Sequence, residues 1–345
     1  MTITATIIGA SGYTGAELIR ILLNHPNVKI KSLIADSSAG KELSESYPHL
    51  AFAGLPKLIK IDEEDFKGVD VVFMGLPHGT TQEVALKLPS HVKIIDISAD
   101  FRLRDASEYE KWYGHKHQAP ELQKGAVYGL TELNREQIKK AKLVACPGCY
   151  PTSILLPLIP LLEKKLIKKS GIIADSKSGI SGAGRKAVQA NLFTEVNENV
   201  KPYGISGHRH VSEIEQELGL IAKEKIMMTF TPQVVPLNRG MLSCIYVENE
   251  AGVTSEQLKK ALEEKYKGEK FVKIAAGNYI PTMRDVATTN LALINVFADR
   301  VGGRSTIISA IDNLTKGASG QAVQNMNLVF GFPEDMGLNF TPVFP

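Results

Sequence analysis

The first half of the chain alternates short apolar runs with stretches in which apolar residues recur at helical spacing. The apolar runs predict strands at 3–8, 28–35, 69–74, 92–97 and 143–146, and the periodic stretches predict helices at 13–24 and 80–88. Nearly continuous apolar strands that alternate with helices are typical of a parallel sheet with both faces covered. The pattern therefore predicts an α/β domain built on such a sheet.

The pattern changes in the middle of the chain. Strand-like runs at 171–174, 227–235, 242–247, 271–275 and 291–298 outnumber the helices, and several alternate apolar with polar residues. Alternation indicates a sheet with one buried face, so we expect a second, α+β domain with a mixed or antiparallel sheet. Within it, the sequence from Thr254 to Gln257 resembles a capping box and predicts a helix to about Tyr266. A last helical pattern at 317–330 can return to cover the first sheet.

Composition and charge narrow the classes of function. A chain of 345 residues accommodates two domains, and 43% hydrophobic with 22% charged residues is ordinary for a globular protein. The net charge of +3, with Lys and Arg spread along the chain, gives no electrostatic case for nucleic acid as a partner. Three cysteines argue against a disulfide framework and fit a reducing compartment. Without a secretory pattern or a membrane-spanning stretch, we expect a cytoplasmic protein that does not associate with membranes.

A cysteine stands where the strand at 143–146 gives way to a helical pattern that begins near Pro151. Cys149 is then placed at a helix start, where unpaired backbone N–H groups and the positive end of the dipole favour a thiolate. Gly148 permits a tight turn before it, and Pro151 suits the first helical turn. Cys149 is therefore the candidate nucleophile, whereas Cys146 is expected to end a buried strand.

The same two cysteines also spell C-x-x-C, which is found in redox dithiols and in zinc sites. A zinc site needs two more ligands at close spacing, and the other cysteine, Cys244, is isolated in the sequence. A redox pair would depend equally on Cys146 and Cys149. We expect no metal, and the redox pair remains an alternative.

A glycine-rich loop lies between the first predicted strand and the first predicted helix. Its spacing is G-x-x-G-x-x-G rather than the strict G-x-G-x-x-G of dinucleotide sites, and a structural turn would need glycines as well. The strand before it, the helix after it and a second strand ending about twenty residues later favour nucleotide binding. The expected cofactor-binding residues of this loop are Gly9, Ser11, Gly12, Tyr13, Thr14 and Gly15.

The end of the second predicted strand, where a ribose is usually read, carries opposing signals. Asp36 can accept the ribose hydroxyls and repel a 2′-phosphate, which favours NAD. Ser37, Ser38 and Lys41 follow at once and can hold a phosphate if Asp36 turns away, which favours NADP. These residues leave both cofactors open.

Two histidines and two arginines complete the candidate chemistry. His208 and His210 point the same way if their segment is extended, and a neutral imidazole near a thiol can act as a general acid or base. Glu213 is the near candidate for a further metal ligand, which is too few for a metal site. Arg102 and Arg185 are candidates to clamp a phosphate or carboxylate, although either can serve a structural salt bridge instead.

Six motifs together make the chain resemble the N-acetyl-gamma-glutamyl-phosphate reductases of the semialdehyde dehydrogenase family. They are the glycine loop at 9–15, DISADFR at 96–102, PGCYPT at 147–152, KSGISGAGRK at 177–186, HRHVSEIEQ at 208–216 and IDNLTKG at 311–317. The match runs from the first strand to the closing residues. One departure is Cys146, where the family commonly has Asn.

The resemblance implies a fold and an activity. The fold is a Rossmann-type NADP-binding domain, residues 1–149 and 315–345, joined to a glyceraldehyde-phosphate-dehydrogenase-like catalytic and dimerisation domain, residues 150–314. The activity is the NADPH-dependent reduction of a small acyl phosphate, N-acetyl-gamma-glutamyl phosphate, to the 5-semialdehyde with release of phosphate, in arginine biosynthesis. A homo-oligomer, a dimer or a tetramer, is expected.

The resemblance also assigns roles to residues. Cys149 would carry a thioester, with His210 favoured over His208 as the proton donor and Glu213 beside them. Expected substrate-binding residues are Arg102, Ser98 and Arg185. Beyond the glycine loop, the expected cofactor-binding residues are Ser37, Ser38, Pro77, Ser178, Gly179, Gly182 and Asn313.

Other functions share parts of this pattern. Aspartate-semialdehyde dehydrogenase and the lysine-pathway reductase of an aminoadipyl phosphate perform the same chemistry on another acyl phosphate, so only substrate profiling separates them. A nucleotide-sensing protein would keep the glycine loop and have no need of a nucleophile.

Overall fold

The structure, a computed structural model, describes residues 1–343 and divides into two units. Unit 1 comprises residues 1–147 and 318–339, and unit 2 comprises residues 148–317 together with the described residues from Phe340. The expected limits at 149/150 and 314/315 lie close to these points, whereas the segment from Phe340 was expected in the first domain. That the two units are a cofactor-binding and a catalytic domain stays a prediction.

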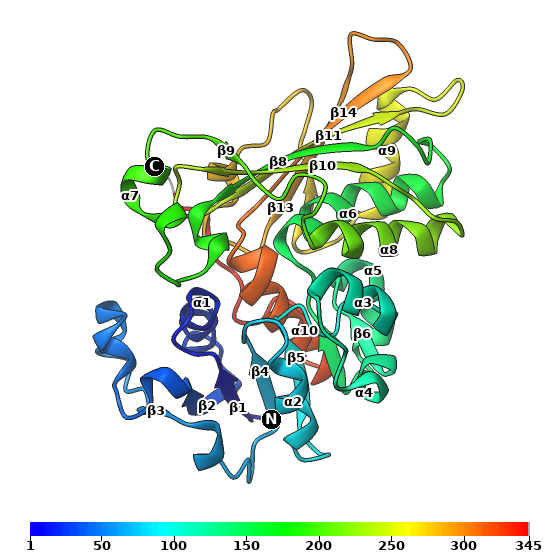
Figure 1. The fold of residues 1–345 in the computed structure, drawn as a ribbon. Coiled ribbons are helices and arrows are strands. Elements are labelled where there is room, and N and C mark those ends of the chain that lie inside the picture. Colours follow the sequence, from blue (N-terminus) through cyan, green and yellow to red (C-terminus); the bar gives the residue numbers. More distant parts are fainter. Residues whose placement is uncertain (344–345) are drawn as a thin grey trace. The chain divides into compact units, whose positions relative to one another are not determined.

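Unit 1 is built on a seven-stranded sheet in which every strand pair is parallel (Figure 1). The strand order is β3-β2-β1-β4-β5-β7-β6. The strands are β1 (Ile3–Ile8), β2 (Val28–Ile34), β3 (Leu58–Ile59), β4 (Val71–Met74), β5 (Lys93–Asp96), β6 (Ala126–Tyr128) and β7 (Leu143–Ala145). The expected α/β domain is thus confirmed, and the short strands β3 and β6 are additions to the prediction.

The helices of unit 1 come from both ends of the chain. They are α1 (Tyr13–Leu22), α2 (Thr81–Lys87), α3 (Ala106–Tyr113), α4 (Pro120–Lys124), α5 (Thr131–Ile138) and α10 (Gly320–Val329). As expected, α10 returns to this unit, where it packs against α1, α5 and β5. The prediction of one continuous helix over 317–330 was wrong at its start, because Thr315–Ser319 form a π-helix and α10 begins at Gly320.

Unit 2 contains a seven-stranded mixed sheet with the order β12-β13-β14-β11-β8-β10-β9. The strands are β8 (Ile173–Gly179), β9 (Lys201–Pro202), β10 (Thr229–Val235), β11 (Met241–Glu248), β12 (Val272–Ile274), β13 (Ala292–Ala298) and β14 (Arg304–Ile311). Pairs β8/β10 and β12/β13 are parallel, and the other pairs are antiparallel. This confirms the expected mixed sheet.

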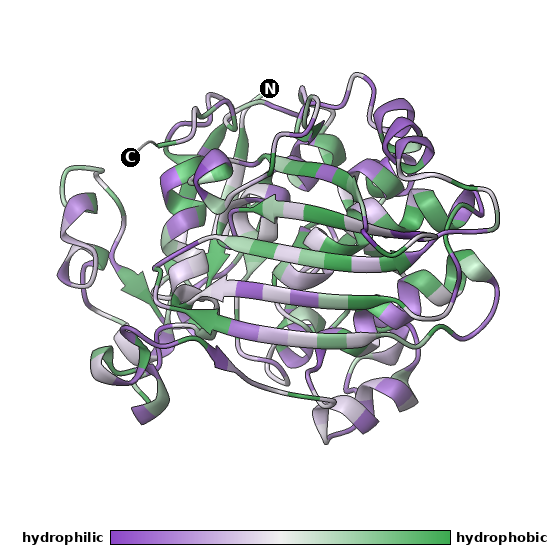
Figure 2. Ribbon diagram, turned by 90° about the horizontal axis from the view of Figure 1, so that it is seen from above, coloured by the Kyte–Doolittle hydropathy of each residue, from purple (hydrophilic) through white to green (hydrophobic). Residues whose placement is uncertain are grey.

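One face of the unit 2 sheet is covered by helices. They are α6 (Cys149–Glu163), α8 (His210–Ala222) and α9 (Ser255–Lys265), and the short α7 (Phe193–Val196) lies apart from them. Helix α6 packs against β11 and β14, α8 packs against α6, and α9 packs against β13. The predicted capping box of Thr254 and Gln257 is present at the start of α9. Figure 2 shows the opposite face of this sheet without a helix over it.

Helix α6 is almost entirely apolar and is buried from Tyr150 to Leu162. It contains Pro157 and Pro160, which have no N–H to donate to the carbonyl one turn earlier. For Pro160 that carbonyl belongs to Leu156, and the Tyr266 hydroxyl donates to it instead. The buried Leu156 oxygen, for which α6 has no donor, therefore accepts a hydrogen bond from Tyr266, the C-cap of α9. Among the described residues, no helix is long and apolar enough to cross a bilayer.

Candidate active site

Cys149 is the first residue of α6, as its position before a helical pattern predicted. Gly148 is the N-cap of α6, and the Gly148 N–H donates to Glu213 Oε1 at 2.9 Å. The helix begins two residues before Pro151, which occupies its first turn. Cys149 is half-buried at this end of α6. Because its thiol lies at a helix start, the positive end of the helix dipole favours the thiolate.

Gly148 is required for a different reason from the predicted one. Its backbone, at φ −65° and ψ 160°, is open to any residue, so the turn itself does not need glycine. A Cβ at position 148 would lie 2.7 Å from His210 Cε1 and closer still to Nε2. The His210 ring therefore lies directly on the backbone of the residue before Cys149, a contact that no local sequence signal reports.

The histidine segment is not extended. His210 is the first residue of α8, whereas His208 precedes the helix, and their ring centroids are 4.8 Å apart with planes inclined by 60°. The condition under which both side chains would point the same way, an extended strand, is thus not met. Glu213 follows His210 by one helical turn, which places both side chains on the same side of α8.

The two histidines differ in their surroundings. His208 Nδ1 accepts the backbone N–H of His210 at 3.1 Å. Burial, and then the charge of Arg209, lower the pKa of His208 to about 4, so this ring is neutral at physiological pH. Glu213 is only 2% exposed, and its carboxylate contacts Gly148, the N-cap of α6.

A second close approach holds Cys149 from the other side. A Cβ at Gly317 would lie 2.7 Å from the Cβ of Cys149, so this position also requires glycine. The Gly317 N–H donates to the Asp312 backbone oxygen at 2.9 Å, and the buried Asp312 carboxylate forms a bidentate ion pair with Arg239. Sequence reasoning assigned no role to Gly317, Asp312 or Arg239, although the first two lie in the 311–317 motif.

The residues expected near a nicotinamide come together in unit 2. Asn313 Oδ1 accepts the Gly240 N–H at 2.7 Å, and its Nδ2 donates to Ser181 Oγ at 2.9 Å. A Cβ at Gly182 would lie 3.1 Å from Ser178 Oγ and 3.8 Å from Asn313 Nδ2. Gly179 also lies against the backbone of Arg239, where a Cβ would stand 2.8 Å from its N and Cα. The four predicted residues therefore form one polar, glycine-lined cluster.

In unit 1 the glycine loop has the geometry that a pyrophosphate requires. Gly9 has φ +86°, and a Cβ there would collide with the backbone oxygen of Gly75. A Cβ at Gly15 would lie 2.7 Å from the Ala10 oxygen, so the first turn of α1 packs too closely on the loop after β1 for a side chain. Gly12 caps α1 without a side-chain hydrogen bond, which leaves the first backbone N–H groups of the helix to an anion. These residues fit a dinucleotide.

The Asp36 side chain, just after β2 where a ribose is usually read, has a defined orientation. Asp36 Oδ1 accepts the backbone N–H of Ile61 at 3.1 Å, so its carboxylate is turned toward the segment after β3. Asp36, Ser37 and Ser38 form one short 3-10 turn. Pro77, the other cofactor candidate outside the loop, is exposed, and its carbonyl accepts the Thr80 hydroxyl.

Two of the substrate candidates are buried at the end of β5. Arg102 Nε donates to the Cys146 oxygen at 2.8 Å and its Nη2 donates to the Ile97 oxygen at 3.1 Å. Ser98 donates to the Asp96 carboxylate from both its N–H and its hydroxyl. Burial raises the pKa of Asp96 to about 7, against the lowering effect of these Ser98 bonds. Sequence reasoning did not single out Asp96, which lies within the strand predicted at 92–97 and is the last residue of β5 in the structure.

Cys146 is a buried thiol at the end of β7. It is completely buried, burial raises its pKa to about 12, and Asn325 Nδ2 lies 3.6 Å from its sulfur. All three cysteines are free thiols. The remaining substrate candidate, Arg185, lies on an exposed segment that follows the turn at Ile180–Ala183.

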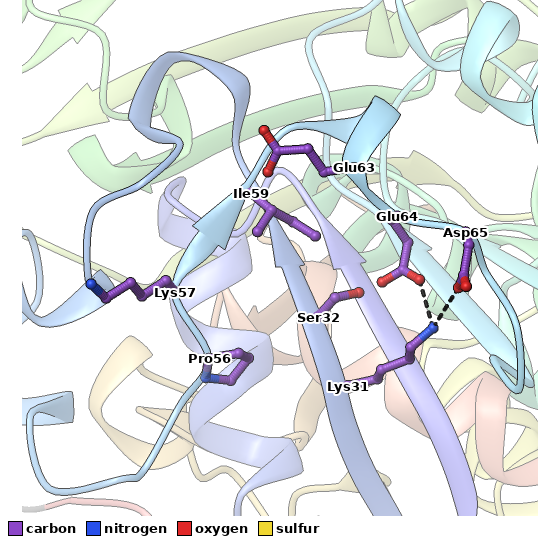
Figure 3. A pocket seen from close by; sticks show the side chains of 8 residues that line it. All are labelled: Lys31, Ser32, Pro56, Lys57, Ile59, Glu63, Glu64 and Asp65. Atoms are coloured by element: carbon purple, nitrogen blue, oxygen red, sulfur yellow. Dashed lines mark hydrogen bonds and ion pairs between the residues drawn. The ribbon is translucent and has the colours of Figure 1, made fainter.

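A surface pocket of about 400 Å³ lies at the β2–β3 edge of unit 1 (Figure 3) and contains none of the predicted site residues. Its lining is Lys31, Ser32, Pro56, Lys57, Ile59, Glu63, Glu64 and Asp65. Lys31 contacts Glu64 at 2.7 Å and Asp65 at 3.0 Å, so its charge is already neutralised from within the pocket.

Comparisons with known proteins agree with this arrangement. Residues 4–141 match the NAD binding domain of semialdehyde dehydrogenases, and residues 149–313 match their dimerisation domain. The chain is 56% identical to a probable chloroplastic N-acetyl-gamma-glutamyl-phosphate reductase of Oryza sativa, over 98% of this chain and 82% of the relative. It is 49% identical to the N-acetyl-gamma-glutamyl-phosphate reductase of Rhodospirillum rubrum, over 99% of both chains.

Solved structures share the fold at lower identity. Aspartate semialdehyde dehydrogenase II of Vibrio cholerae has a TM-score of 0.73 at 20% identity, covering 96% of this chain and 99% of that chain. The Candida albicans aspartate semialdehyde dehydrogenase, solved with NADP, has a TM-score of 0.67 at 18% identity, covering 96% of this chain and 99% of that chain.

Proposed function

The chain belongs to the N-acetyl-gamma-glutamyl-phosphate reductases of the semialdehyde dehydrogenase family (EC 1.2.1.38), and we propose that it performs this step of arginine biosynthesis through a thioester on Cys149. The observation that carries the proposal is a single arrangement. A cysteine begins helix α6, with His210 lying on the preceding glycine and Glu213 bonded to that glycine's N–H.

The first half-reaction uses the start of α6. The Cys149 thiolate attacks the carbonyl carbon of the acyl phosphate, the C–O bond to phosphate breaks, and inorganic phosphate leaves a thioester behind. A negatively charged oxygen develops on that carbon during the attack. Backbone N–H groups of the first turn of α6, including that of Cys149, are the donors we assign to it, because the helix does not use them internally.

The second half-reaction returns the thiolate. NADPH, when bound, supplies the hydride that reduces the thioester to a thiohemiacetal on Cys149. His210 donates a proton to the oxygen that becomes negatively charged when the hydride adds. It takes the proton back as the C–S bond breaks, which releases the aldehyde and the free thiolate. Glu213 accepts the Gly148 N–H and lies one turn after His210 on the same side of α8. It therefore fixes the side of α8 that carries the imidazole against the start of α6.

For the cofactor we favour NADP over NAD. The glycine loop at the start of α1 would hold the pyrophosphate through its backbone N–H groups. Asp36, which would repel a 2′-phosphate, is engaged by the Ile61 N–H, and this orientation favours a phosphate beside Ser37 and Ser38. Pro77 is assigned to the same site, and the cluster of Ser178, Gly179, Gly182 and Asn313 is assigned to the nicotinamide. Turnover rates with NADPH and NADH at equal concentration test the preference.

For the substrate we assign Ser98, Arg102 and Arg185, with Arg102 as the phosphate-site residue. The bonds from Arg102 to two backbone oxygens add a positioning role, since one of those oxygens belongs to Cys146. Replacing Arg102 by Lys keeps the charge and loses the fork of donors. A substrate role predicts a rise in KM for phosphate in the reverse direction.

We further propose that the enzyme is a homo-oligomer, a dimer or a tetramer, in a reducing compartment such as the cytoplasm. By strand register, the partly exposed apolar residues Leu242, Tyr246, Leu293, Phe297 and Ile308 share one face of the unit 2 sheet. A face of this kind suits a second copy of the chain. Three free thiols fit a reducing compartment. Sedimentation analysis and cell fractionation test these two points.

The decisive experiment runs the reaction backwards. The purified enzyme is given N-acetylglutamate 5-semialdehyde or aspartate semialdehyde, with and without phosphate, and the reduction of NADP⁺ or NAD⁺ is followed. We expect phosphate-dependent reduction of NADP⁺ with the acetylated aldehyde. A preference for aspartate semialdehyde would overturn the substrate assignment, and reduction without phosphate would overturn the acyl-phosphate chemistry.

A further inference from the structure

His208 lies in a box of aromatic rings in unit 2. The ring centroids of Tyr203, Phe230 and Tyr150 are 5.3, 5.5 and 5.6 Å from that of His208, and all three rings are nearly perpendicular to it. Edge-to-face contacts of this kind fix the orientation of a ring. The same packing removes water, which is why burial lowers the pKa of His208 so far.

The box holds His208 in one tautomer. Because its Nδ1 accepts the His210 N–H at 3.1 Å, the single proton of the neutral ring belongs on Nε2. The accepted N–H is at the start of α8, where the helix itself offers no acceptor. His208 therefore fills the place that a Ser, Thr or Asp side chain commonly takes at an N-cap, from one residue further upstream.

We propose that His208 is a positioning residue, whose Nδ1 fixes the backbone at His210 and thereby sets the His210 ring on Gly148. The proposal rests on the proposed function, in which His210 exchanges the proton with the intermediate on Cys149. It separates two histidines that sequence spacing alone does not distinguish: His208 positions and His210 reacts. A displacement of about 1 Å at a reacting group costs on the order of a hundredfold in rate, so the backbone anchor matters to kcat.

The surroundings of His208 argue against its being the proton donor itself. A second proton on this ring would have to go to Nδ1, and it would break the bond from the His210 N–H. The aromatic box offers no carboxylate to stabilise an imidazolium there, and the adjacent Arg209 opposes one. A group that cycles between two protonation states is not expected in such a place.

Two substitutions that mimic different ring nitrogens test the proposal. In His208→Asn the amide oxygen takes the place of Nδ1 and can still accept the His210 N–H, whereas in His208→Gln the amide lies near the place of Nε2. We expect His208→Asn to keep kcat within about threefold of the wild type and His208→Gln to lose at least about tenfold, with KM changing less than kcat.

A readout without substrate accompanies the kinetics. The rate of Cys149 alkylation by iodoacetamide, measured against pH, reports the thiolate and its neighbour His210. His208→Asn should reproduce the wild-type pH profile and His208→Gln should displace it. A merely structural role would lower the melting temperature of both variants and leave the profile of the folded enzyme unchanged, which would overturn the proposal.

The outcomes separate this proposal from the one on which it rests. If His208→Asn loses as much kcat as His208→Gln, positioning through Nδ1 is wrong. If His210→Asn turns over like the wild type, the acid/base assignment of the proposed function is wrong instead. Should His208→Gln fail to fold, the Asn variant alone decides, because the proposal requires it to be active with the wild-type profile.

Discussion

The Gly148 N–H donates to Glu213 Oε1 at 2.9 Å, so the residue before Cys149 is bonded to a carboxylate that is 65 positions later in the chain. This bond joins the N-cap of α6 to the first turn of α8. It also uses the N–H that stands nearest to Cys149 on its N-terminal side. Helix α6, which begins at Cys149, and helix α8, which begins at His210, are therefore joined by one buried hydrogen bond.

Glu213 variants should separate the hydrogen bond from the charge. Glu213→Gln retains an oxygen that can accept the Gly148 N–H, whereas Glu213→Ala leaves that buried N–H without an acceptor. We expect the Ala variant to lose about 1–3 kcal/mol of unfolding free energy and the Gln variant less than about 1 kcal/mol. In kcat we expect about a tenfold loss for Gln, because the carboxylate's charge beside His210 is gone. Equal stability of the two variants would contradict this assignment of the bond.

Gly148→Ala tests the contact with His210. The backbone conformation of residue 148 accepts alanine, so the effect of the substitution is confined to the new Cβ, which would displace the His210 ring. We expect kcat to fall by on the order of a hundredfold while NADPH binding is retained. Gly302→Ala is the matched control, since a Cβ there meets nothing within 4 Å. An unchanged kcat in Gly148→Ala would show that turnover does not depend on the present position of the His210 ring.

Cys149→Ser and Cys146→Ser should behave in opposite ways. Serine is a far weaker nucleophile than a thiolate, so Cys149→Ser should abolish turnover and leave NADPH binding, measured by fluorescence, intact. Cys146 is completely buried and its pKa is raised to about 12, so its thiol stays protonated and Cys146→Ser should retain turnover. Equal losses of activity would revive the dithiol alternative, and appreciable activity in Cys149→Ser would defeat the nucleophile assignment.

The position of Cys149 at a helix start was predictable because its signals are local. A strand, a glycine, a cysteine and a proline follow one another within ten residues, and each acts on its immediate neighbours. The reason for Gly148 was not predictable in the same way, because the ring that excludes a Cβ comes from a different helix. Sequence proximity likewise placed His208 beside His210 without showing that a helix begins between them.

Two of the elements that the sequence missed, α8 and β14, have patterns that conflict with their burial. Helix α8 buries Glu213 and Glu217, which are 2% and 6% exposed, so its inner face does not read as an apolar stripe. Strand β14 begins with three polar residues and buries Ser305 and Ser309. Five strands of unit 1, β1, β2, β4, β5 and β7, were predicted to within a residue or two because their burial and their apolar character coincide.

Tyr266 and Pro160 should show coupled effects on stability. Tyr266→Phe removes the donor to the Leu156 oxygen and should cost about 1–3 kcal/mol, with kcat unchanged, because it leaves a buried acceptor unsatisfied. Pro160→Ala supplies an N–H one turn after Leu156, so the same Tyr266→Phe change should cost about 1 kcal/mol less in that background. Urea unfolding of the four proteins measures the coupling. An equal cost in both backgrounds would mean that the two groups do not serve the same carbonyl.

His25 should make unit 1 less stable in mild acid. Its Nδ1 accepts the Asn27 N–H at 3.2 Å, so its Nε2 carries the proton and donates to Asn327 Oδ1 at 2.9 Å. The Asn327 Nδ2 in turn donates to the backbone oxygens of Glu334 and Met336. These bonds fix the orientation of the amide, so its Oδ1 faces the His25 ring as an acceptor. Burial lowers the pKa of His25, and the Asn327 bond offsets only part of this.

The sign of the pH dependence follows from that lowered pKa. Below about pH 6.5 the unfolded chain binds a proton on His25 that the folded chain does not, so unfolding becomes more favourable as the pH falls. The contribution of His25 is at most about 1.4 kcal/mol per pH unit in this window, and none is expected above it. His25→Gln keeps a donor for Asn327 and cannot titrate, so its unfolding free energy should fall less between pH 7.5 and 5.5. His117, whose pKa burial also lowers, is present in both proteins and cancels in the comparison. An identical fall in the two proteins would show that His25 takes up its proton without unfolding.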